Sequence, residues 1–110
     1  MPMNKEKALS MLGLARRAGA LSMGHDMAVE SIRKGKAECL LFCADVSPRL
    51  FRDFEITAEK SGWHKKAVRT ELTMDEVGRA AGYRAGVITV NDKNLAKKIC
   101  ELLDQEENEW

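Results

Sequence analysis

Cysteine and histidine are the residues of this chain that could serve as nucleophiles or metal ligands, and they are few. Three cysteines, at positions 39, 43 and 100, and two histidines, at 25 and 64, are spread over 110 residues. If Cys39 and Cys43 lie on one strand, four residues at about 3.3 Å each hold them roughly 13 Å apart, too far to share an ion. Neither histidine has a partner at metal-ligand spacing. The sequence therefore predicts no metal site and no cofactor, with the cysteines packed in the core.

Enzyme chemistry has little support in the motifs. The two common phosphate-binding loops of α/β enzymes, G-x-G-x-x-G and G-x-x-x-x-G-K-[ST], are absent. Cys43, beside Asp45 at the end of an apolar run, is the remaining nucleophile candidate. A nucleophile needs a base, which the sequence spacing does not supply. Without a convergent acid, base and nucleophile, the sequence indicates a protein that is not an enzyme.

A different kind of chemistry is offered by MGHDM, residues 23–27, which has the features of a helix start. The first N–H groups of a helix are unpaired and partially positive, and a glycine there lets a phosphate or a base edge approach the backbone. Gly24 fits this role. The alternative is a plain cap, with His25 and Asp26 as exposed residues of the first turn and Asp26 favoured by the helix dipole.

The net charge of +1 conceals an asymmetry along the chain. Residues 1–98 carry all 18 lysines and arginines against 12 acids, a balance of +6, whereas residues 99–110 carry five acids and no base. A basic body suggests a polyanionic partner, and dispersed solvated charge is the alternative. The acidic tail, at about 104–110, has little helical pattern and is expected to be mobile and to repel RNA.

Helical and strand patterns alternate along the chain and would position these residues. Apolar residues at helical spacing predict helices over 4–18, 24–34, 47–61, 73–81 and 92–103. The runs 38–44 and 85–90 indicate strands covered on both faces, with weaker candidates at 20–23 and 66–70. This order predicts an α/β fold in one domain, residues 1–110: a three-layer α/β/α sandwich with a mixed sheet of about four strands.

The chain also lacks the patterns of membrane and secretory proteins. No apolar run approaches the roughly 20 residues of a membrane span, and the N-terminus lacks the layout of a signal peptide. We therefore expect a cytoplasmic protein, a monomer with no membrane partner.

Two segments carry a family resemblance. LGLARRAGALSMGHDMAVESIRKGKAECLLFCADVSP, followed by VGRAAGYRAGVITV, resembles the L-seven-Ae/L-thirty-e/Gadd45-type family of ribosomal and kink-turn RNA-binding proteins, in particular its short bacterial YlxQ-like branch. The most specific pieces are the glycine before the second helix, the strand ending in CADVSP and the VGRAAG turn. The resemblance covers nearly the whole chain. It implies an α/β/α sandwich that binds structured RNA without catalysis, through the start of the second helix and the neighbouring loops.

The family's RNA-reading segment, G-x-N-E-x-x-K, falls on residues 24–30 in this resemblance. Gly24 is retained, whereas Asp26, Met27 and Glu30 stand where the family has asparagine, glutamate and lysine. An ionised Asp26 only accepts hydrogen bonds and repels phosphate, and Glu30 reverses the expected charge. The changes predict weakened kink-turn binding, although Asp26 can still accept from a guanine edge and Gly24 still admits a close approach.

Three further positions are implied by the resemblance. Val46 matches a hydrophobic residue near an extruded base, and Tyr83 and Arg84 lie in the loop that lines the same site. Such a set suits unstacked RNA bases, with simple packing and solvated charge as the alternatives. The expected RNA-binding residues are Gly24, His25, Asp26, Met27, Val46, Tyr83 and Arg84, with electrostatic help from Arg16, Arg17, Arg33 and Lys34.

We therefore expect a non-catalytic, ribosomal-protein-like accessory factor that binds structured, kink-turn-like RNA in a ribonucleoprotein. The alternative is a protein-interaction module on the same fold, in which the second helix has lost its RNA and the acidic tail contacts a basic partner. The loss of N-E-x-x-K favours that alternative.

Overall fold

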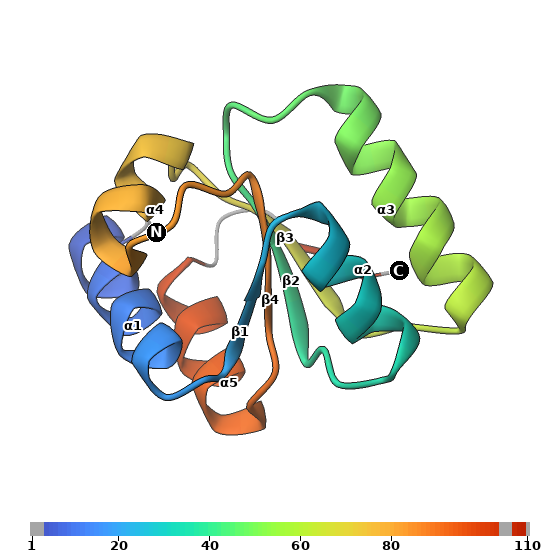
Figure 1. Cartoon of the computed structure of the whole chain (residues 1–110), viewed down its shortest axis with the longest axis horizontal. Helices are drawn as coiled ribbons and strands as arrows, with labels where there is room; N and C mark the ends of the chain where they lie inside the picture. The colour runs from blue at the N-terminus through green and yellow to red at the C-terminus, as the bar shows by residue number, and fades with distance from the viewer. Residues whose placement is uncertain (1–3, 104–106, 110) are drawn as a thin grey trace.

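The computed structural model describes residues 4–103 and 107–109, in which five helices cover the two faces of a mixed sheet (Figure 1). The helices are α1 (Lys5–Arg17), α2 (His25–Arg33), α3 (Pro48–Ser61), α4 (Met74–Ala81) and α5 (Lys93–Leu102). The strands are β1 (Leu21–Met23), β2 (Cys39–Phe42), β3 (Lys66–Arg69), β4 (Val87–Val90) and β5 (Glu107–Glu109). Among the described helices, none combines the length and the apolar composition that a membrane span requires.

The strand order in the sheet is β1-β4-β2-β3-β5. Strands β2 and β3 run parallel, with Leu41 opposite Val68, because the crossover through α3 returns the chain to the same end of the sheet. Strand β4 lies antiparallel between β1 and β2, with Ile88 opposite both Met23 and Leu41. The predicted α/β fold with a mixed sheet is confirmed.

The fifth strand was not expected from the sequence. Glu107–Glu109 pairs antiparallel with β3, with Val68 opposite Glu107, in the acidic tail for which the sequence predicts little helical pattern and mobility. An edge strand forms through backbone N–H and C=O groups, which every residue other than proline carries, so it needs no apolar pattern. Residues 104–106 and 110 of the tail lie outside the described residues.

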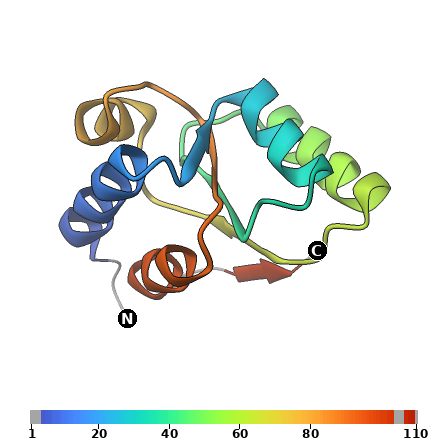
Figure 2. The ribbon, with the colours of Figure 1, turned by 60° about the horizontal axis from the view of Figure 1, so that its bottom comes forward.

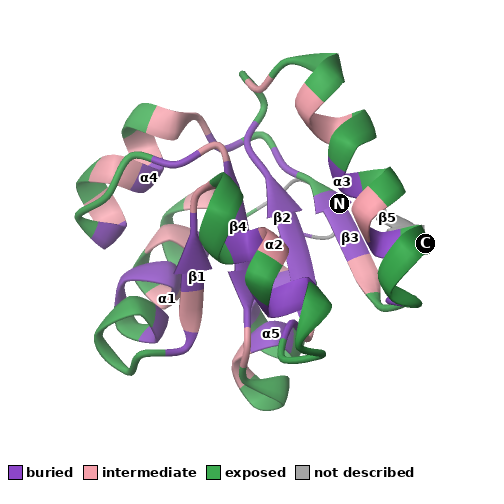
Figure 3. Cartoon of the chain, turned by 45° about the vertical axis from the view of Figure 1, so that its right-hand side comes forward, coloured by how far each residue is buried: buried purple, intermediate pink, exposed green. Residues whose placement is uncertain are grey.

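Side chains of β2 alternate between two cores, one on each face of the sheet. Leu41 packs in the core that includes Leu12 and lies under α1, α4 and α5. Phe42 faces the opposite core, with Ile32 of α2 and Phe54 of α3. Figures 1 and 2 show the two helical layers on either side of the sheet, and Figure 3 shows the central strands fully buried. The continuous apolar run at 38–44 follows from this burial on both faces.

Helix starts are fixed by the caps that the sequence predicted. Thr73 and Glu76 form a capping box, in which Thr73 N–H donates to Glu76 Oε1 at 2.9 Å and Glu76 N–H donates to Thr73 Oγ1 at 3.1 Å. Ser47 Oγ accepts from the third helical residue of α3, and Asp92 Oδ1 does the same for α5. Helix α4 therefore begins at a defined residue. The loop that follows α4 and leads to β4 contains Tyr83 and Arg84, two of the predicted RNA-binding residues.

Gly13 lies where α1 packs against α4 and offers a test of that contact. A Cβ at position 13 would lie 2.8 Å from the carbonyl oxygen of Ala80, a backbone atom that cannot rotate away. Gly13→Ala must therefore push α1 and α4 apart. We expect this clash to outweigh the higher helix propensity of alanine and to lower the free energy of unfolding by about 1–3 kcal/mol, the usual cost of overpacking, as measured by urea denaturation.

Gly78→Ala in α4 is the matched control, since it makes the same change at another helical glycine. A Cβ there would meet the Cα and Cβ of Arg84 at 3.4 Å. The higher helix propensity of alanine, worth about 1 kcal/mol, offsets that tight contact, so stability should stay within about 1 kcal/mol of the parent. Equal stability of the two variants would contradict the close approach at Gly13.

Candidate nucleic-acid interface

Three segments that are far apart in the sequence meet at one end of the sheet, the upper end in Figure 1. They are the β1–α2 junction, the residues after β2 and the loop before β4. Gly24 N–H donates to Val87 C=O at 3.0 Å, which joins the first segment to the third. Cys43 N–H donates to Gly86 C=O at 2.9 Å, which joins the second to the third. Backbone hydrogen bonds thus fix the relative positions of the candidate residues.

Gly24 is the N-cap of α2 and has a φ of 92°, in the left-handed region that favours glycine. It provides no side-chain cap, so the first N–H groups of α2 receive no acceptor from it. Tyr83 lies beside this bare backbone: a Cβ at position 24 would be 3.6 Å from Tyr83 Oη and 3.7 Å from Cε2. The tyrosine ring and the start of α2 therefore form one continuous surface.

Arg16 extends this surface on the side of α1. Its guanidinium carbon lies 5.8 Å from the centroid of the Tyr83 ring, within the range of a cation–π interaction. Arg16 Nη1 also donates to the carbonyl oxygen of Ala81 at 3.2 Å and contacts Met23 Sδ at 3.1 Å. Tyr83 remains 50% exposed. An exposed ring with a positioned cation beside it is a suitable platform for an unstacked base.

Val46 lies in the segment after β2, and Arg84 follows Tyr83 in the loop before β4. Val46 is half-buried, and its Cγ1 would lie 2.6 Å from a Cβ at position 86, so Gly86 leaves space for it. Arg84 Nε donates to Asp75 Oδ1 at 2.8 Å in an exposed ion pair. The hydrogen bond and charge of Arg84 hold the pKa of the Asp75 carboxyl below its ordinary value. Arg84 therefore has a carboxylate partner at the edge of the candidate surface.

The first turn of α2 presents three exposed side chains, and one of them, His25, also packs against α3. The His25 ring lies edge-on against Phe54 of α3, with centroids 5.3 Å apart, and its Nδ1 is 3.1 Å from Asp26 Oδ1. The Asp26 side chain is fully exposed, and Met27 is 55% exposed. All three side chains are therefore accessible to a partner, and His25 also joins α2 to α3.

The four basic residues expected near phosphates do not gather in one place. Arg16 contacts Tyr83, whereas Arg17, exposed in the last turn of α1, lines a hollow of about 430 Å³ between α1 and α4. Arg33 and Lys34 lie at the other end of α2, roughly 13 Å along its axis from Gly24. Lys34 Nζ pairs with Glu30 Oε1 at 2.6 Å, and this pairing holds the pKa of Glu30 below its ordinary value.

Asp45 was not expected to contribute to the site. Its carboxylate accepts from Met74 N–H at 3.1 Å, so the segment after β2 is tied to the first residue of α4. The chain then runs through α4 to Tyr83. No local signal pairs two residues 29 positions apart, and only the folded chain reveals this contact.

Comparison with known proteins identifies the family of this chain. The model of the ribosomal protein L7Ae/L30e/S12e/Gadd45 family matches residues 6–101. The chain belongs to this family. The resemblance inferred from the sequence is thereby confirmed.

The relatives include two proteins named RNA-binding protein YlxQ. The one from Enterococcus faecium is 28% identical over 101 residues, covering 92% of this chain and 95% of the relative. That from Bacillus subtilis (strain 168) is 30% identical over 95 residues, covering 86% and 92%. The large ribosomal subunit protein eL8 of Haloquadratum walsbyi is 33% identical over 82 residues, covering 74% of this chain and 66% of the relative.

Solved structures share the fold. A protein of unknown function from Bacillus halodurans C superposes with a TM-score of 0.78 and 25% identity, covering 90% of this chain and 98% of that one. The Giardia lamblia 15.5kD RNA binding protein superposes with a TM-score of 0.69 and 19% identity, covering 91% and 84%. At that identity, the second likeness concerns the fold alone.

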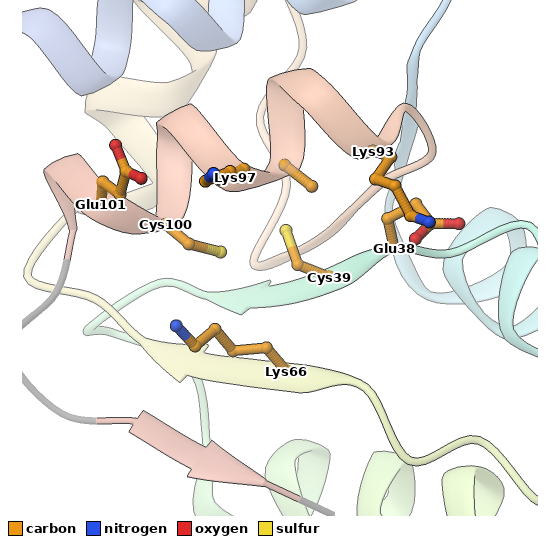
Figure 4. A pocket seen from close by; sticks show the side chains of 8 residues that line it. Glu38, Cys39, Lys66, Lys93, Lys97, Cys100 and Glu101 are labelled. Atoms are coloured by element: carbon orange, nitrogen blue, oxygen red, sulfur yellow. The ribbon is translucent and has the colours of Figure 1, made fainter.

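The cysteines lie in the core, as the sequence predicted. Cys39 and Cys100 line a hollow of about 330 Å³ between β2 and α5, whose lining does not include Tyr83 (Figure 4). Hydrogen bonding with Cys100, together with burial, raises the pKa of the Cys39 thiol. Burial, with the charge of Asp45, raises the pKa of Cys43 to about 12. Over the described residues, no group of three or more His, Cys, Asp or Glu side chains could hold a metal ion.

Thiol labelling tests whether Cys43 could be a nucleophile. With a pKa of about 12, the fraction of thiolate at pH 8 is on the order of one in ten thousand. All three cysteines are at most 5% exposed. We expect iodoacetamide to leave the folded chain unmodified over a time in which it alkylates all three thiols in denaturant, as measured by intact mass. Rapid alkylation of Cys43 in the folded protein would contradict this environment.

Proposed function

We propose that this protein binds structured RNA through the surface formed by the start of α2, the residues after β2 and the loop before β4, as a non-catalytic accessory factor. The observation that carries this proposal is the exposed Tyr83 ring beside the bare Gly24 backbone, with Arg16 next to it. Membership in a family of ribosomal proteins supports it, as do the names of the two YlxQ relatives, which describe RNA-binding proteins.

The chemistry of the surface fits unpaired nucleotides. Specific RNA recognition targets bases that are splayed out of a helix and can stack on aromatic rings or guanidinium planes. Tyr83 offers the ring face and Val46 a small apolar contact. Gly24 itself places no side chain between a sugar–phosphate backbone and the positive end of the α2 dipole, and the Tyr83 ring lies at its side. A kink-turn-like RNA, with an extruded base beside a bend, presents these features together.

The side chains of α2 weaken this binding. Asp26 places a fully exposed carboxylate where an amide could both donate and accept, and Met27 offers no hydrogen bond. Glu30 pairs with Lys34, so a cation near the phosphates is partly neutralised. We therefore propose lower affinity for a kink-turn than the family's usual segment would provide.

A protein-interaction module on the same fold is the second candidate. Met27 and Leu14 are 55% and 51% exposed, and an exposed apolar side chain at the start of α2 suits a protein surface better than a base edge. The two candidate functions predict different results when the family's G-x-N-E-x-x-K residues are restored in α2: only an RNA-binding protein should gain affinity for a kink-turn.

Restoring the RNA-reading segment provides the main test. The triple variant Asp26→Asn, Met27→Glu, Glu30→Lys adds a donor, a base-edge acceptor and a cation. A good base contact is worth roughly 1–3 kcal/mol by analogy with DNA readout, so affinity for a kink-turn RNA should rise at least about tenfold. Filter binding or fluorescence anisotropy against the kink-turn and a plain duplex of equal length measures the effect.

A matched triple on α3 controls for charge. Asp53→Asn, Ile56→Glu and Glu59→Lys make the same three changes of charge on exposed positions of another helix. This variant should show no added preference for the kink-turn. If the α2 variant folds normally and also shows none, the RNA-binding surface is wrong and the protein-interaction module becomes the better account.

Salt dependence tests the phosphate contacts. Arg16→Ala with Arg17→Ala should reduce the slope of log affinity against log salt by about 0.7–0.9 for each lost phosphate contact. Lys97→Ala with Lys98→Ala removes an adjacent pair of exposed cations from α5 and should leave the slope unchanged. Equal slopes for parent and Arg16/Arg17 variant would exclude this patch from the footprint.

A further inference from the structure

A hollow of about 260 Å³ lies beside α2, and we call it the β1–α2 pocket. One face of α2 lines it with Met27, Glu30, Ser31 and Lys34, at helical spacings of three and four residues. Ser22 of β1 and Asn91, directly after β4, are also among its lining residues. The pocket thus begins at the first turn of α2, which belongs to the proposed RNA surface, and runs toward the other end of the helix.

The floor of the pocket is polar in an otherwise apolar interior. The described residues include four buried polar side chains, and three of them are connected here: Ser22, Ser31 and Thr89. Thr89 Oγ1 donates to Asn91 Oδ1 at 3.0 Å, Asn91 Nδ2 donates to Ser22 Oγ at 2.9 Å, and Ser22 Oγ shares a short hydrogen bond with Ser31 Oγ. Burying these groups is unfavourable unless their hydrogen bonds are made, so the chain maintains a satisfied network at this place.

The network leaves part of the hydrogen-bonding capacity of one lining residue unused. Asn91 uses one of its two amide hydrogens on Ser22 and one oxygen lone pair on Thr89. Its other hydrogen and lone pair remain, and the residue is partly exposed at the pocket. An asparagine amide that donates and accepts side by side is the group that proteins use on the edge of adenine.

The rim supplies the other contacts that a nucleotide needs. Met27 is 55% exposed and offers a polarisable apolar surface for the face of a base. Lys36, exposed after the end of α2, lines the pocket together with Lys34 and places positive charge at the end remote from Met27. Apolar contact, a donor–acceptor floor and a cation therefore occur in one hollow.

We propose that the β1–α2 pocket binds one unstacked nucleotide, with its base on the Ser22–Ser31–Asn91 floor against Met27 and its phosphate near Lys36. The volume of about 260 Å³ lies just below the roughly 300–1,000 Å³ of drug-sized sites, which suits a single base. The proposal deepens the RNA-binding function and rests on it for the source of the ligand. It extends the footprint from the Gly24 end of α2 to its Lys34 end.

Free mononucleotides provide the first arm of the test. In ¹H–¹⁵N correlation spectra of the full chain, AMP should shift the Asn91 side-chain amide and the backbone amides of Ser22 and Ser31. Ribose phosphate, which lacks the base, should not. Lys36→Ala should weaken AMP binding about two- to fivefold, the effect of one exposed ion pair, whereas Lys60→Ala on α3 should leave it unchanged.

Hairpin RNAs provide the second arm, one with a single bulged adenosine and one fully paired. The bulged hairpin should shift the same three signals, and the paired hairpin should not. If AMP and the bulged hairpin both leave Asn91 and Ser31 unshifted, the pocket proposal is overturned, and shifts at Gly24 and Tyr83 in that experiment would leave the proposed RNA function standing. AMP binding in the pocket without binding of either hairpin or a kink-turn would support the pocket and overturn the RNA function.

Discussion

Strand β4 pairs antiparallel with β1 on one side and with β2 on the other, and this pairing holds the candidate surface together. Because β1 and β2 end where β4 begins, the residues that follow them meet the loop that precedes β4. The hydrogen bonds from Gly24 to Val87 and from Cys43 to Gly86 extend the pairing by one residue beyond each strand. Any RNA contact made by Gly24, Val46 and Tyr83 together depends on this register, since a shift by one residue would reverse every side chain of β4.

Helix α4 gives the Tyr83 loop a rigid support. Its start is fixed by the Thr73–Glu76 capping box and by the carboxylate of Asp45, and its side is fixed where Gly13 lets α1 approach the Ala80 carbonyl. Its end is contacted by Arg16, which donates to the Ala81 carbonyl and lies near the tyrosine ring. A ring held from these sides loses little freedom when a base stacks on it, which favours binding.

Helix α2 contributes to two neighbouring surfaces with different chemistry. Its N-terminus offers bare backbone and a dipole, whereas the face toward β1 borders a floor of hydroxyl and amide groups. Met27 belongs to both. The Glu30–Lys34 pair lies toward the C-terminal end of the helix and lowers the positive potential there. In such an arrangement, affinity for RNA would come from apolar and backbone contacts to unstacked nucleotides more than from cations along α2.

Much of the fold is encoded locally. The caps at Ser47, Thr73 and Asp92, together with periodic apolar residues, determined where helices begin and which faces they bury. The apolar runs at 38–44 and 85–90 determined that two strands are covered on both faces. Strand β5 was not predicted, because an edge strand that pairs through its backbone requires no particular side-chain pattern in the sequence.

The candidate site, like the fold, was predicted from the sequence in part and depends on the tertiary structure for the rest. The sequence by itself determined that Gly24 starts a helix and that family membership points to α2 and its neighbouring loops. Only the tertiary structure decided that Tyr83 lies beside Gly24, that Arg84 pairs with Asp75, and that Arg16 lies near the tyrosine ring. Caps and periodicity depend on neighbours within one or two turns, whereas these contacts depend on strand order and helix packing, which join residues that no local pattern relates.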